Sequence, residues 1–324
     1  MGRGAFEHNY GALEIPELRA PYAGPLPSAV ACDLPRPAEH SPTVDLYCGD
    51  NLHLTCWLLD QGRRFRLIYV DPPFNSGRAY RARVGGAHGR QSTGVHAYED
   101  ERDLDEYLDW LRLRLESCRD LLAADGTLYV HLDWHTVHYV KVLLDRIFGR
   151  QRFLNEIIWC YHGPSPITRA FSRKHDTILV YTRGRDYYFD ADAVRTPYDP
   201  ATVKTFQSSP KAGFGKVPNL RRGKVPEDWW YFPVVARLHG ERVGYETQKP
   251  LRLLQRIVHA SSASGDAVLD LFAGSGTTGV AAVASGRDAV LVDSNPVAVE
   301  KSLLRLRRLE PPPAIRLWRS ADPA

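Results

Sequence analysis

Short apolar runs alternate with amphipathic stretches along most of the chain. Residues 65–70 (FRLIYV) and 126–132 (GTLYVHL) have the length and composition of buried parallel strands, and the first run stops abruptly at an Asp-Pro-Pro sequence. Leucines recur at helical spacing between these runs, with charged residues among them, which predicts a helix over 103–123. A second helix is expected over 137–148.

The alternation continues in the second half of the chain. Strands are expected at 155–161, 176–182, 267–272 and 289–293, and helices at 251–261, 278–284 and 297–309. Strands that alternate with helices predict an α/β fold built on a doubly wound, mostly parallel sheet.

Two segments fall outside this alternation. Residues 1–42 contain seven prolines and little periodicity, which predicts a proline-rich N-terminal arm. Residues 184–246 are rich in aromatic, glycine, proline and basic residues and lack a long periodic segment, so we interpret them as an inserted recognition region. The core domain is then expected to comprise 43–183 and 247–310, followed by a C-terminal tail over 311–324.

Composition narrows the class of protein. Hydrophobic residues make up 44% of the 324 residues and charged residues 25%, as in an ordinary globular protein. No run of 18 uncharged apolar residues is present, and the first ten residues lack the features of a secretory signal, so a cytoplasmic protein without a membrane span is expected. The five cysteines form no C-x-x-C pair, which supports neither a disulfide framework nor a cysteine zinc site.

Three histidines and an aspartate fall close together in the sequence. His131 lies at the end of a predicted strand, whereas His135 and His138 lie on the following predicted helix, near Asp133. Metal ligation is one interpretation, but this spacing does not imply that the side chains converge. We therefore predict ordinary polar surface here and no metal site.

Basic and aromatic residues gather in the predicted recognition region. The net charge of +4 is only a weak sign of a polyanionic partner, but six basic residues and no acidic one fall within 201–224. A second stretch, 77–98, has four arginines and no acidic residue. Such runs are either solvated loops or contacts to phosphates. The aromatic run 229–232 (WWYF) either packs the region on the core, which we favour, or stacks on bases.

A glycine loop follows the strand predicted at 267–272. Gly274-x-Gly276-x-x-Gly279 permits a tight turn and close approach of a ligand to the backbone, although a purely structural turn is the simpler alternative. Asp293 ends the next strand about 20 residues later, where a carboxylate can bind ribose hydroxyls. Either a dinucleotide or S-adenosylmethionine fits this pattern. Only 31 residues follow Asp293, too few for the further strands of a dinucleotide fold, so the pattern favours S-adenosylmethionine in a circularly permuted sheet.

Several motifs together resemble those of amino-group DNA methyltransferases. Asp71-Pro72-Pro73-Phe74 resembles their catalytic motif, and 268–282 (VLDLFAGSGTTGVAA) resembles their cofactor motif, with Leu271 where proline is usual. The segments 46–51 (LYCGDN) and 245–250 (YETQKP), together with the strands expected at 155–161 and 176–182, are similar to further motifs of the family. Their order, with the catalytic motif first and the cofactor motif last, is that of the permuted beta group. The resemblance covers roughly residues 44–309.

The catalytic motif suits methylation of an exocyclic amino group. Such a nitrogen is a poor nucleophile because its lone pair is delocalised into the ring of the base. Asp71 and the carbonyl of Pro72 can accept its two hydrogens, and the consecutive prolines fix the backbone that aims this carbonyl. Phe74 offers a flat face for a base flipped out of the duplex. No covalent enzyme intermediate is required.

The resemblance also implies partners and binding residues. The expected cofactor residues are Asp50, Gln248, Lys249, Pro250, Asp270, Phe272, Gly274, Ser275, Gly276, Thr277 and Asp293. The expected contacts to double-stranded DNA are Arg78, Arg81, Arg83, Lys204, Lys211, Lys216, Arg221, Arg222 and Lys224. Aspartate at the start of the catalytic motif favours adenine N6 as the acceptor, with cytosine N4 as the alternative. A homodimer is expected, acting alone or beside a cognate restriction endonuclease. A catalytically silent DNA-binding subunit is the remaining alternative.

Overall fold

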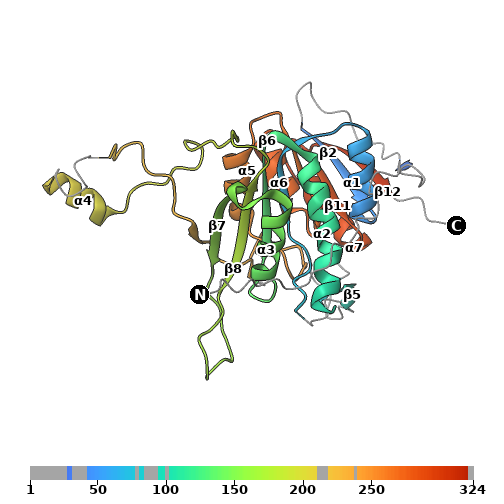
Figure 1. Ribbon diagram of the computed structural model, residues 1–324, viewed down its shortest axis with the longest axis horizontal. Helices are drawn as coiled ribbons and strands as arrows, with labels where there is room; N and C mark the ends of the chain where they lie inside the picture. The colour runs from blue at the N-terminus through green and yellow to red at the C-terminus, as the bar shows by residue number, and fades with distance from the viewer. Residues whose placement is uncertain are drawn as a thin grey trace, which may run out of the picture.

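The computed structural model describes residues 42–76, 102–209, 218–236 and 239–319 with their side chains, and the backbone alone at 28–30, 80–83 and 94–98. Its centre is a ten-stranded sheet (Figure 1). In spatial order the strands are β1 (Ser28–Val30), β12 (Ala314–Arg319), β2 (Thr43–Cys48), β11 (Asp288–Asp293), β10 (Ala267–Asp270), β3 (Phe65–Val70), β6 (Leu122–Leu132), β8 (His175–Thr182), β7 (Phe153–Cys160) and β9 (Trp229–Tyr231).

The strands from β12 to β6 are all parallel, and this parallel block forms the middle of the sheet. β8 and β7 follow it as antiparallel strands, and β1 adds an antiparallel strand at the opposite edge. β4 (Tyr80–Arg83) and β5 (Gly94–Tyr98) pair as a separate two-stranded ribbon. The predicted doubly wound, mostly parallel sheet is therefore confirmed.

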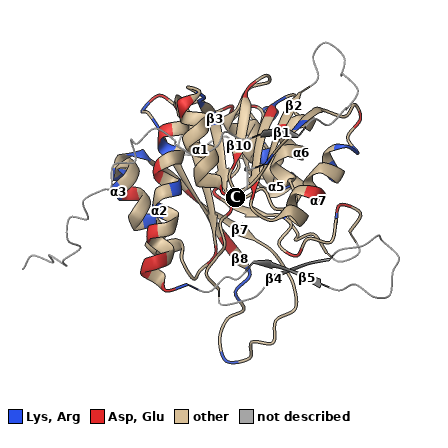
Figure 2. Cartoon of the chain, turned by 90° about the vertical axis from the view of Figure 1, so that its right-hand side faces the viewer, with Lys and Arg blue, Asp and Glu red and all other residues tan. Residues whose placement is uncertain are grey.

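Helices cover both faces of the sheet (Figure 2). On one face lie α1 (Asn51–Asp60), α2 (Leu104–Leu121) and α3 (Val137–Phe148), and on the other lie α5 (Leu251–Ser261), α6 (Thr277–Ala284) and α7 (Pro296–Leu306). Successive residues of a strand therefore enter different cores. Leu67 of β3 packs toward α5–α7, whereas its neighbour Ile68 packs toward α1–α3.

The chain around residue 311 differs from the sequence interpretation. The segment 311–324 was expected to be a tail, but its residues 314–319 form β12, which pairs in parallel with β2. The proline-rich arm likewise contributes β1, which pairs with β12. Both additions cover the backbone of a strand that would otherwise stand at the open edge of the sheet. A six-residue strand next to three consecutive prolines is too short to give a clear periodic signal.

The segment 184–246 leaves the sheet and returns to it. Figure 1 shows an extended path outward to α4 (Pro200–Ser208) and back. Thr196 and Lys224 exchange two backbone hydrogen bonds of 2.9 Å, so the outgoing and returning segments are joined partway along this path. The short 3-10 helix Arg150–Arg152 connects α3 to β7. No helix in the described part of the chain is long and apolar enough to cross a membrane.

Candidate active site

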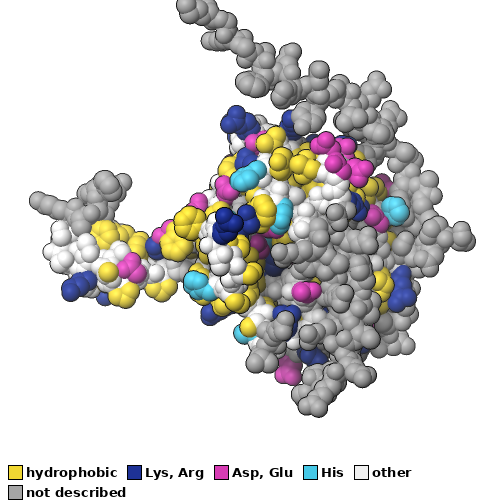
Figure 3. All heavy atoms as spheres, turned by 90° about the horizontal axis from the view of Figure 1, so that it is seen from below, with side chains coloured by type: hydrophobic (Ala, Val, Ile, Leu, Met, Phe, Trp, Pro, Cys, Tyr) yellow, Lys and Arg dark blue, Asp and Glu magenta, His cyan; other side chains and the backbone are white. Residues whose placement is uncertain are grey.

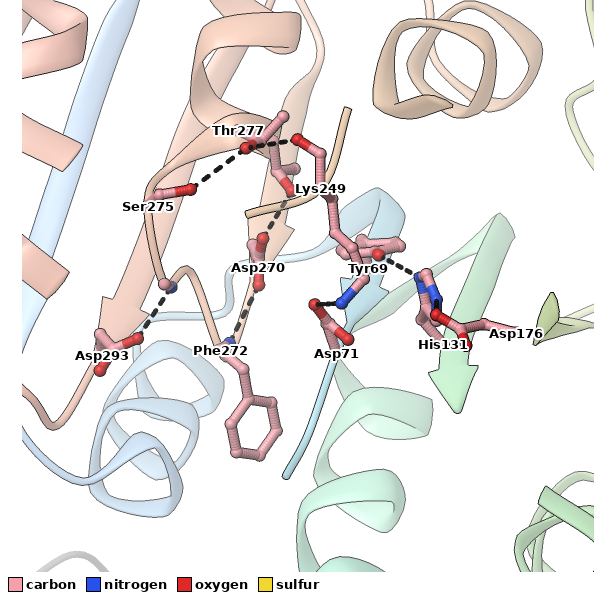
Figure 4. Close-up of polar contacts among 12 residues, drawn as sticks. Tyr69, Asp71, His131, Asp176, Lys249, Asp270, Phe272, Ser275, Thr277 and Asp293 are labelled. Carbon is pink, nitrogen blue, oxygen red and sulfur yellow. Dashed lines mark hydrogen bonds and ion pairs between the residues drawn. The ribbon is translucent and has the colours of Figure 1, made fainter. Parts of the chain in front are cut away.

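A cavity of about 250 Å³ opens where the parallel strands β3, β10 and β11 end. The carboxyl edge of a doubly wound sheet is the usual place for a ligand. Ten of the residues predicted for the site line this cavity: Asp50, Asp71, Pro73, Lys249, Asp270, Phe272, Gly274, Ser275, Thr277 and Asp293. The sheet thus brings the predicted catalytic segment and the predicted cofactor loop to one place, because β3 and β10 are neighbouring strands (Figure 4).

The glycine loop between β10 and α6 is held in a left-handed turn. Gly274 and Gly276 have φ angles of +51° and +72°, a region that side chains with a Cβ rarely adopt. A Cβ on Gly276 would also lie only 2.8 Å from the Cβ of Ser302 on α7. Asp293 accepts a hydrogen bond of 2.8 Å from the amide of Gly274, so the end of β11 fixes the loop. Gly276 itself does not line the cavity.

Arg305 of α7 is a support of this loop that the sequence interpretation missed. Its buried guanidinium donates hydrogen bonds of 2.9 Å to the carbonyl of Ser275 and 2.8 Å to the hydroxyl of Thr277. Glu241, 3.6 Å away, is its acidic partner. Since Arg305 is one of several arginines in a charged helix, its sequence context carries no signal of this role.

Two carboxyl groups that line the cavity, those of the buried Asp270 and the partly buried Asp293, have raised pKa values. Burial raises the pKa of Asp270 to about 7, although hydrogen bonds from Thr278 and the amide of Phe272 oppose this shift. Burial also raises the pKa of Asp293 to about 6. These acids are costly to ionise without a ligand, so a bound cation or hydroxyl donor would compensate for their burial.

Asp50 serves as a helix cap and lines the cavity as well. It accepts a hydrogen bond of 2.7 Å from the amide of Leu52 at the start of α1 and pairs with Arg114 at 2.9 Å. Arg114 also donates to Asn51 at 2.6 Å, and Asn51 donates to the carbonyl of Leu271 at 2.9 Å. The turn after β2 is therefore tied directly to the segment after β10.

Trp110 and Phe272 form an aromatic wall of the cavity. Their ring centroids lie 5.7 Å apart, and the guanidinium of Arg114 lies 4.2 Å from the Trp110 ring. Trp110, on α2, was not among the predicted site residues because its place in an amphipathic helix is equally consistent with core packing.

Asp71 follows β3 and forms an ion pair with Lys249. The Lys249 ammonium lies 2.6 Å from the Asp71 carboxylate, and the two side chains are only 10% and 16% exposed. The same ammonium lies 5.1 Å from the centre of the Phe74 ring. Lys249, which the resemblance implies is a cofactor residue, thus contacts the predicted catalytic segment and also lines the cavity beside the cofactor loop (Figure 4).

The neighbours of Lys249 do not line the cavity. Gln248 is buried and spans the preceding loop, where it accepts from the amide of Val243 and donates to the carbonyl of Glu241. Pro250 precedes α5 as its N-terminal cap. Both residues therefore shape the loop before α5, and their contact with the cofactor stays a prediction.

A buried polar network around His131 packs against the catalytic segment. The prediction of polar surface at His131 is wrong, because His131 is completely buried. Its ring nitrogens lie 2.8 Å from the Tyr69 hydroxyl and 3.2 Å from Asp176. Although burial alone would raise the pKa of Asp176, its hydrogen bond with His131 contributes to a net lowering. The Phe74 ring stacks on His131 with centroids 6.0 Å apart.

Further contacts hold the two prolines. The Tyr107 hydroxyl of α2 donates 2.8 Å to the carbonyl of Pro73, and Pro72 is buried outside the cavity lining. Asn75, with a φ of +55°, exchanges hydrogen bonds of 2.8 and 2.9 Å with the backbone of Arg102. His135 lies 2.6 Å from the Asp133 carboxylate, and the described residues contain no group of three or more His, Cys, Asp and Glu side chains that could hold a metal ion.

The residues predicted to contact DNA are of three kinds: some pair with acidic side chains, some are exposed, and some have side chains outside the described residues. Arg222 pairs with Asp192 at 2.7 Å, and Lys224 pairs with Glu227. Lys204 and Arg221 are exposed. Arg78, Lys211 and Lys216, and the side chains of Arg81 and Arg83, lie outside the described residues. On the projecting segment, basic side chains are interspersed with acidic ones (Figure 3), which the absence of acids within 201–224 did not indicate.

The aromatic run 229–232 faces two ways. Trp230 is buried and its indole donates to the carbonyl of Glu227, whereas Trp229 and Tyr231 on the same short strand are 62% and 51% exposed. The favoured interpretation, packing on the core, therefore holds for Trp230, and the alternation of the strand places its neighbours outside.

The fold and the position of the site define a class of α/β protein with solved representatives. The fold matches the M1.HpyAVI–SAM complex with a TM-score of 0.54 and 17% identity, over 82% of this chain and all of that one. It matches the PvuII DNA methyltransferase (cytosine-N4-specific) with a TM-score of 0.54 and 16% identity, over 82% of this chain and 89% of that one. These likenesses place the fold among those of DNA methyltransferases.

The chain belongs to the DNA methylase family (N6_N4_Mtase), whose model it matches over residues 65–303. It is 30% identical to the type II methyltransferase M.HpaI of Haemophilus parainfluenzae over 241 residues, which are 74% of this chain and 67% of that protein. It is 29% identical to the DNA adenine methyltransferase YhdJ of Escherichia coli (strain K12), over 74% of this chain and 75% of the relative. The predicted family is confirmed.

Proposed function

We propose that the protein transfers a methyl group from S-adenosylmethionine to N6 of adenine in duplex DNA, after the base has been flipped out. The observation that carries this proposal is the shared cavity. Asp71, after β3, and the glycine loop, after β10, line the same space from neighbouring parallel strands. An acceptor for amino hydrogens thus lies beside a loop suited to a nucleoside cofactor.

The residues present fit S-adenosylmethionine by their chemistry. Asp293 offers a carboxylate for ribose hydroxyls, and Asp270 offers one for the ammonium of the methionine portion. Trp110 and Phe272 offer apolar ring surface for an adenine. Once bound, the cofactor supplies an electrophilic methyl group on a sulfonium. The protein's part is to hold it beside the acceptor nitrogen and to exclude water.

The catalytic segment is suited to bind the amino group of the acceptor. The Asp71 carboxylate and the Pro72 carbonyl are the proposed acceptors of its two hydrogens. The contact from Tyr107 to Pro73 fixes this segment, and the stack of Phe74 on His131 supports a platform for the flipped base. Because Lys249 donates to Asp71, a base that enters the site must replace one N–H donor at this carboxylate by another.

Adenine is the proposed acceptor, although the matched proteins include both kinds. YhdJ is described as an adenine methyltransferase and the PvuII enzyme as cytosine-N4-specific. Phe74 carries no hydroxyl and recognises shape by stacking, for which a purine has the larger face. An A·T pair also has fewer hydrogen bonds to break during flipping.

The identity of the base can be tested directly. DNA from cells that express the chain should contain N6-methyladenine when it is digested to nucleosides and analysed by mass spectrometry, and sequencing that detects modified bases should place it at a defined sequence. DNA from cells expressing Asp71→Ala is the matched control. N4-methylcytosine as the sole product would overturn the choice of base and leave methyl transfer intact. Neither product, together with no cofactor binding by calorimetry, would favour the silent-subunit alternative.

We also propose a homodimer in the cytoplasm, acting alone or with a cognate restriction endonuclease. Light scattering at micromolar concentration should give twice the chain mass of 36.5 kDa. The proposal of a dimer rests on the family resemblance, and a fully active monomer at that concentration would contradict it.

A further inference from the structure

The loop between β7 and β8, residues 161–174, projects from the sheet at the edge that carries the active site. β6 runs parallel to β3, and β8 runs antiparallel to β6, so the start of β8 lies beside the end of β6. The loop therefore leaves the sheet next to His131, on which Phe74 stacks. Figure 1 shows it extending well beyond the strands.

The two ends of this loop are fixed to the buried polar network around His131. The Tyr161 hydroxyl donates 3.0 Å to Asp176, which also contacts His131. The Tyr161 amide donates 3.0 Å to the carbonyl of Lys174, and the Lys174 ammonium donates 2.8 Å to the carbonyl of Pro164. These hydrogen bonds hold the two ends of the loop together. They also link the loop to the stack of Phe74 on His131 that is proposed to support the flipped base.

The tip of the loop presents a phenylalanine to solvent. Phe171 is 98% exposed, the highest value among the large hydrophobic side chains that the structure describes; the next is Trp229 at 62%. Burial in the fold therefore does not account for this side chain. Its two neighbours are small, Ala170 and Ser172, so the ring stands clear of other bulk.

The charge of the loop matches a nucleic acid. Residues 161–175 include Arg169, Arg173 and Lys174 and no acidic residue. Within the described residues neither Arg169 nor Arg173 forms an ion pair, whereas Arg222 and Lys224 of the recognition region are both paired with acids. Arg173 instead lies 4.0 Å from the Trp134 ring. Figure 2 shows blue and no red along this loop.

We propose that this loop enters the duplex at the target site, with Phe171 as a wedge that fills the space left by the flipped base. Arg169 and Arg173 bind the flanking phosphates. Apolar side chains that enter between base pairs stabilise an unstacked step, and arginines beside them hold the backbone. The inference rests on the proposed function and names an element of the protein that would drive flipping.

The experiment measures methyl transfer by Phe171→Ala on two duplexes that contain the target sequence. In one duplex the target base is correctly paired, and in the other it faces a mismatched partner, which lowers the cost of extruding it. We expect kcat/KM to fall about 10- to 100-fold on the paired duplex and less than about threefold on the mismatched one. Phe171→Trp should restore most of the activity on the paired duplex.

Matched variants separate the wedge from other effects. Leu304→Ala removes an exposed large hydrophobic side chain from the last turn of α7, outside the predicted recognition region, and should behave like the natural protein on both duplexes. Arg169→Ala with Arg173→Ala should lower the slope of log affinity against log salt by about two, whereas Arg222→Ala should change it less because Asp192 already neutralises that guanidinium.

The outcomes distinguish this inference from the proposed function. If the natural protein methylates DNA and Phe171→Ala loses activity equally on both duplexes, or on neither, the wedge is wrong and the proposed function stands. If the natural protein methylates neither duplex, the proposed function itself is wrong. If the salt slope is unchanged in the double arginine variant, Arg169 and Arg173 do not contact phosphates, and another class of partner binds this loop.

Discussion

Asp71→Ala is expected to lower methyl transfer by at least about 100-fold while leaving cofactor affinity nearly unchanged. The carboxylate is proposed to accept a hydrogen of the reacting amino group and to strengthen that contact as the nitrogen becomes tetrahedral. The cofactor is proposed to be held by other side chains, chiefly Asp270 and Asp293. Transfer of labelled methyl groups to DNA and calorimetry with the cofactor measure the two quantities separately.

Two further variants control this result. Asp71→Asn keeps the shape of the side chain but offers only one acceptor atom and no charge to Lys249, so it should remain at least about tenfold impaired. Asp109→Ala removes an exposed carboxylate of α2 and should be fully active. Since Lys249 loses its partner in Asp71→Ala, thermal melts must show that the variant is folded. Activity of Asp71→Ala within a few-fold of the natural protein would exclude the catalytic role.

The second large effect is a dependence of stability on pH in the cofactor-free protein. The folded state raises the pKa of Asp270 from 3.8 to about 7 and that of Asp293 from 3.8 to about 6. The folded protein therefore binds more protons than the unfolded chain between about pH 4 and pH 7, so stability is lost as the pH rises through this range. For Asp270 alone the shift corresponds to about 4 kcal/mol.

Thermal melts between pH 5 and pH 8 test this expectation. The melting temperature without cofactor should fall as the pH rises, and Asp270→Asn should flatten the dependence because it removes the larger titration. Cofactor affinity should change in the opposite direction, tightening roughly tenfold from pH 5.5 to pH 7.5, because the bound ammonium favours ionised Asp270. A melting temperature that rises across the range in both proteins would show that Asp270 is ionised without a ligand.

The elements that the sequence predicted well are those with strong local patterns. The helix predicted over 251–261 coincides with α5, because its apolar residues recur at helical spacing and form one buried face. The strand predicted over 65–70 coincides with β3, because a strand covered on both faces of the sheet is a nearly continuous apolar run. Asp71, Gly274 and Asp293 were found because they stand at strand ends, where chain order alone brings parallel strands to a common edge.

The features that were missed depend on contacts between distant parts of the chain. Asp71 and Lys249 are 178 residues apart, and no spacing predicts that their side chains meet. His131 looks like a surface residue beside an aspartate and two histidines, and only the packing of β8 against β6 shows that Asp176 satisfies it inside the protein. Single arginines such as Arg305 acquire their role from the loop that another helix places beside them.

The ion pair between Lys249 and Asp71 has a consequence for turnover. The Lys249 ammonium donates to the carboxylate that is proposed to accept from the amino group of the base, so lysine and base compete for one acceptor. An unmodified amino group brings two N–H donors to this acceptor pair, and the methylated product brings one. On the proposed function Lys249 therefore competes more successfully with the methylated product than with the substrate, so its ion pair with Asp71 speeds release of the methylated base.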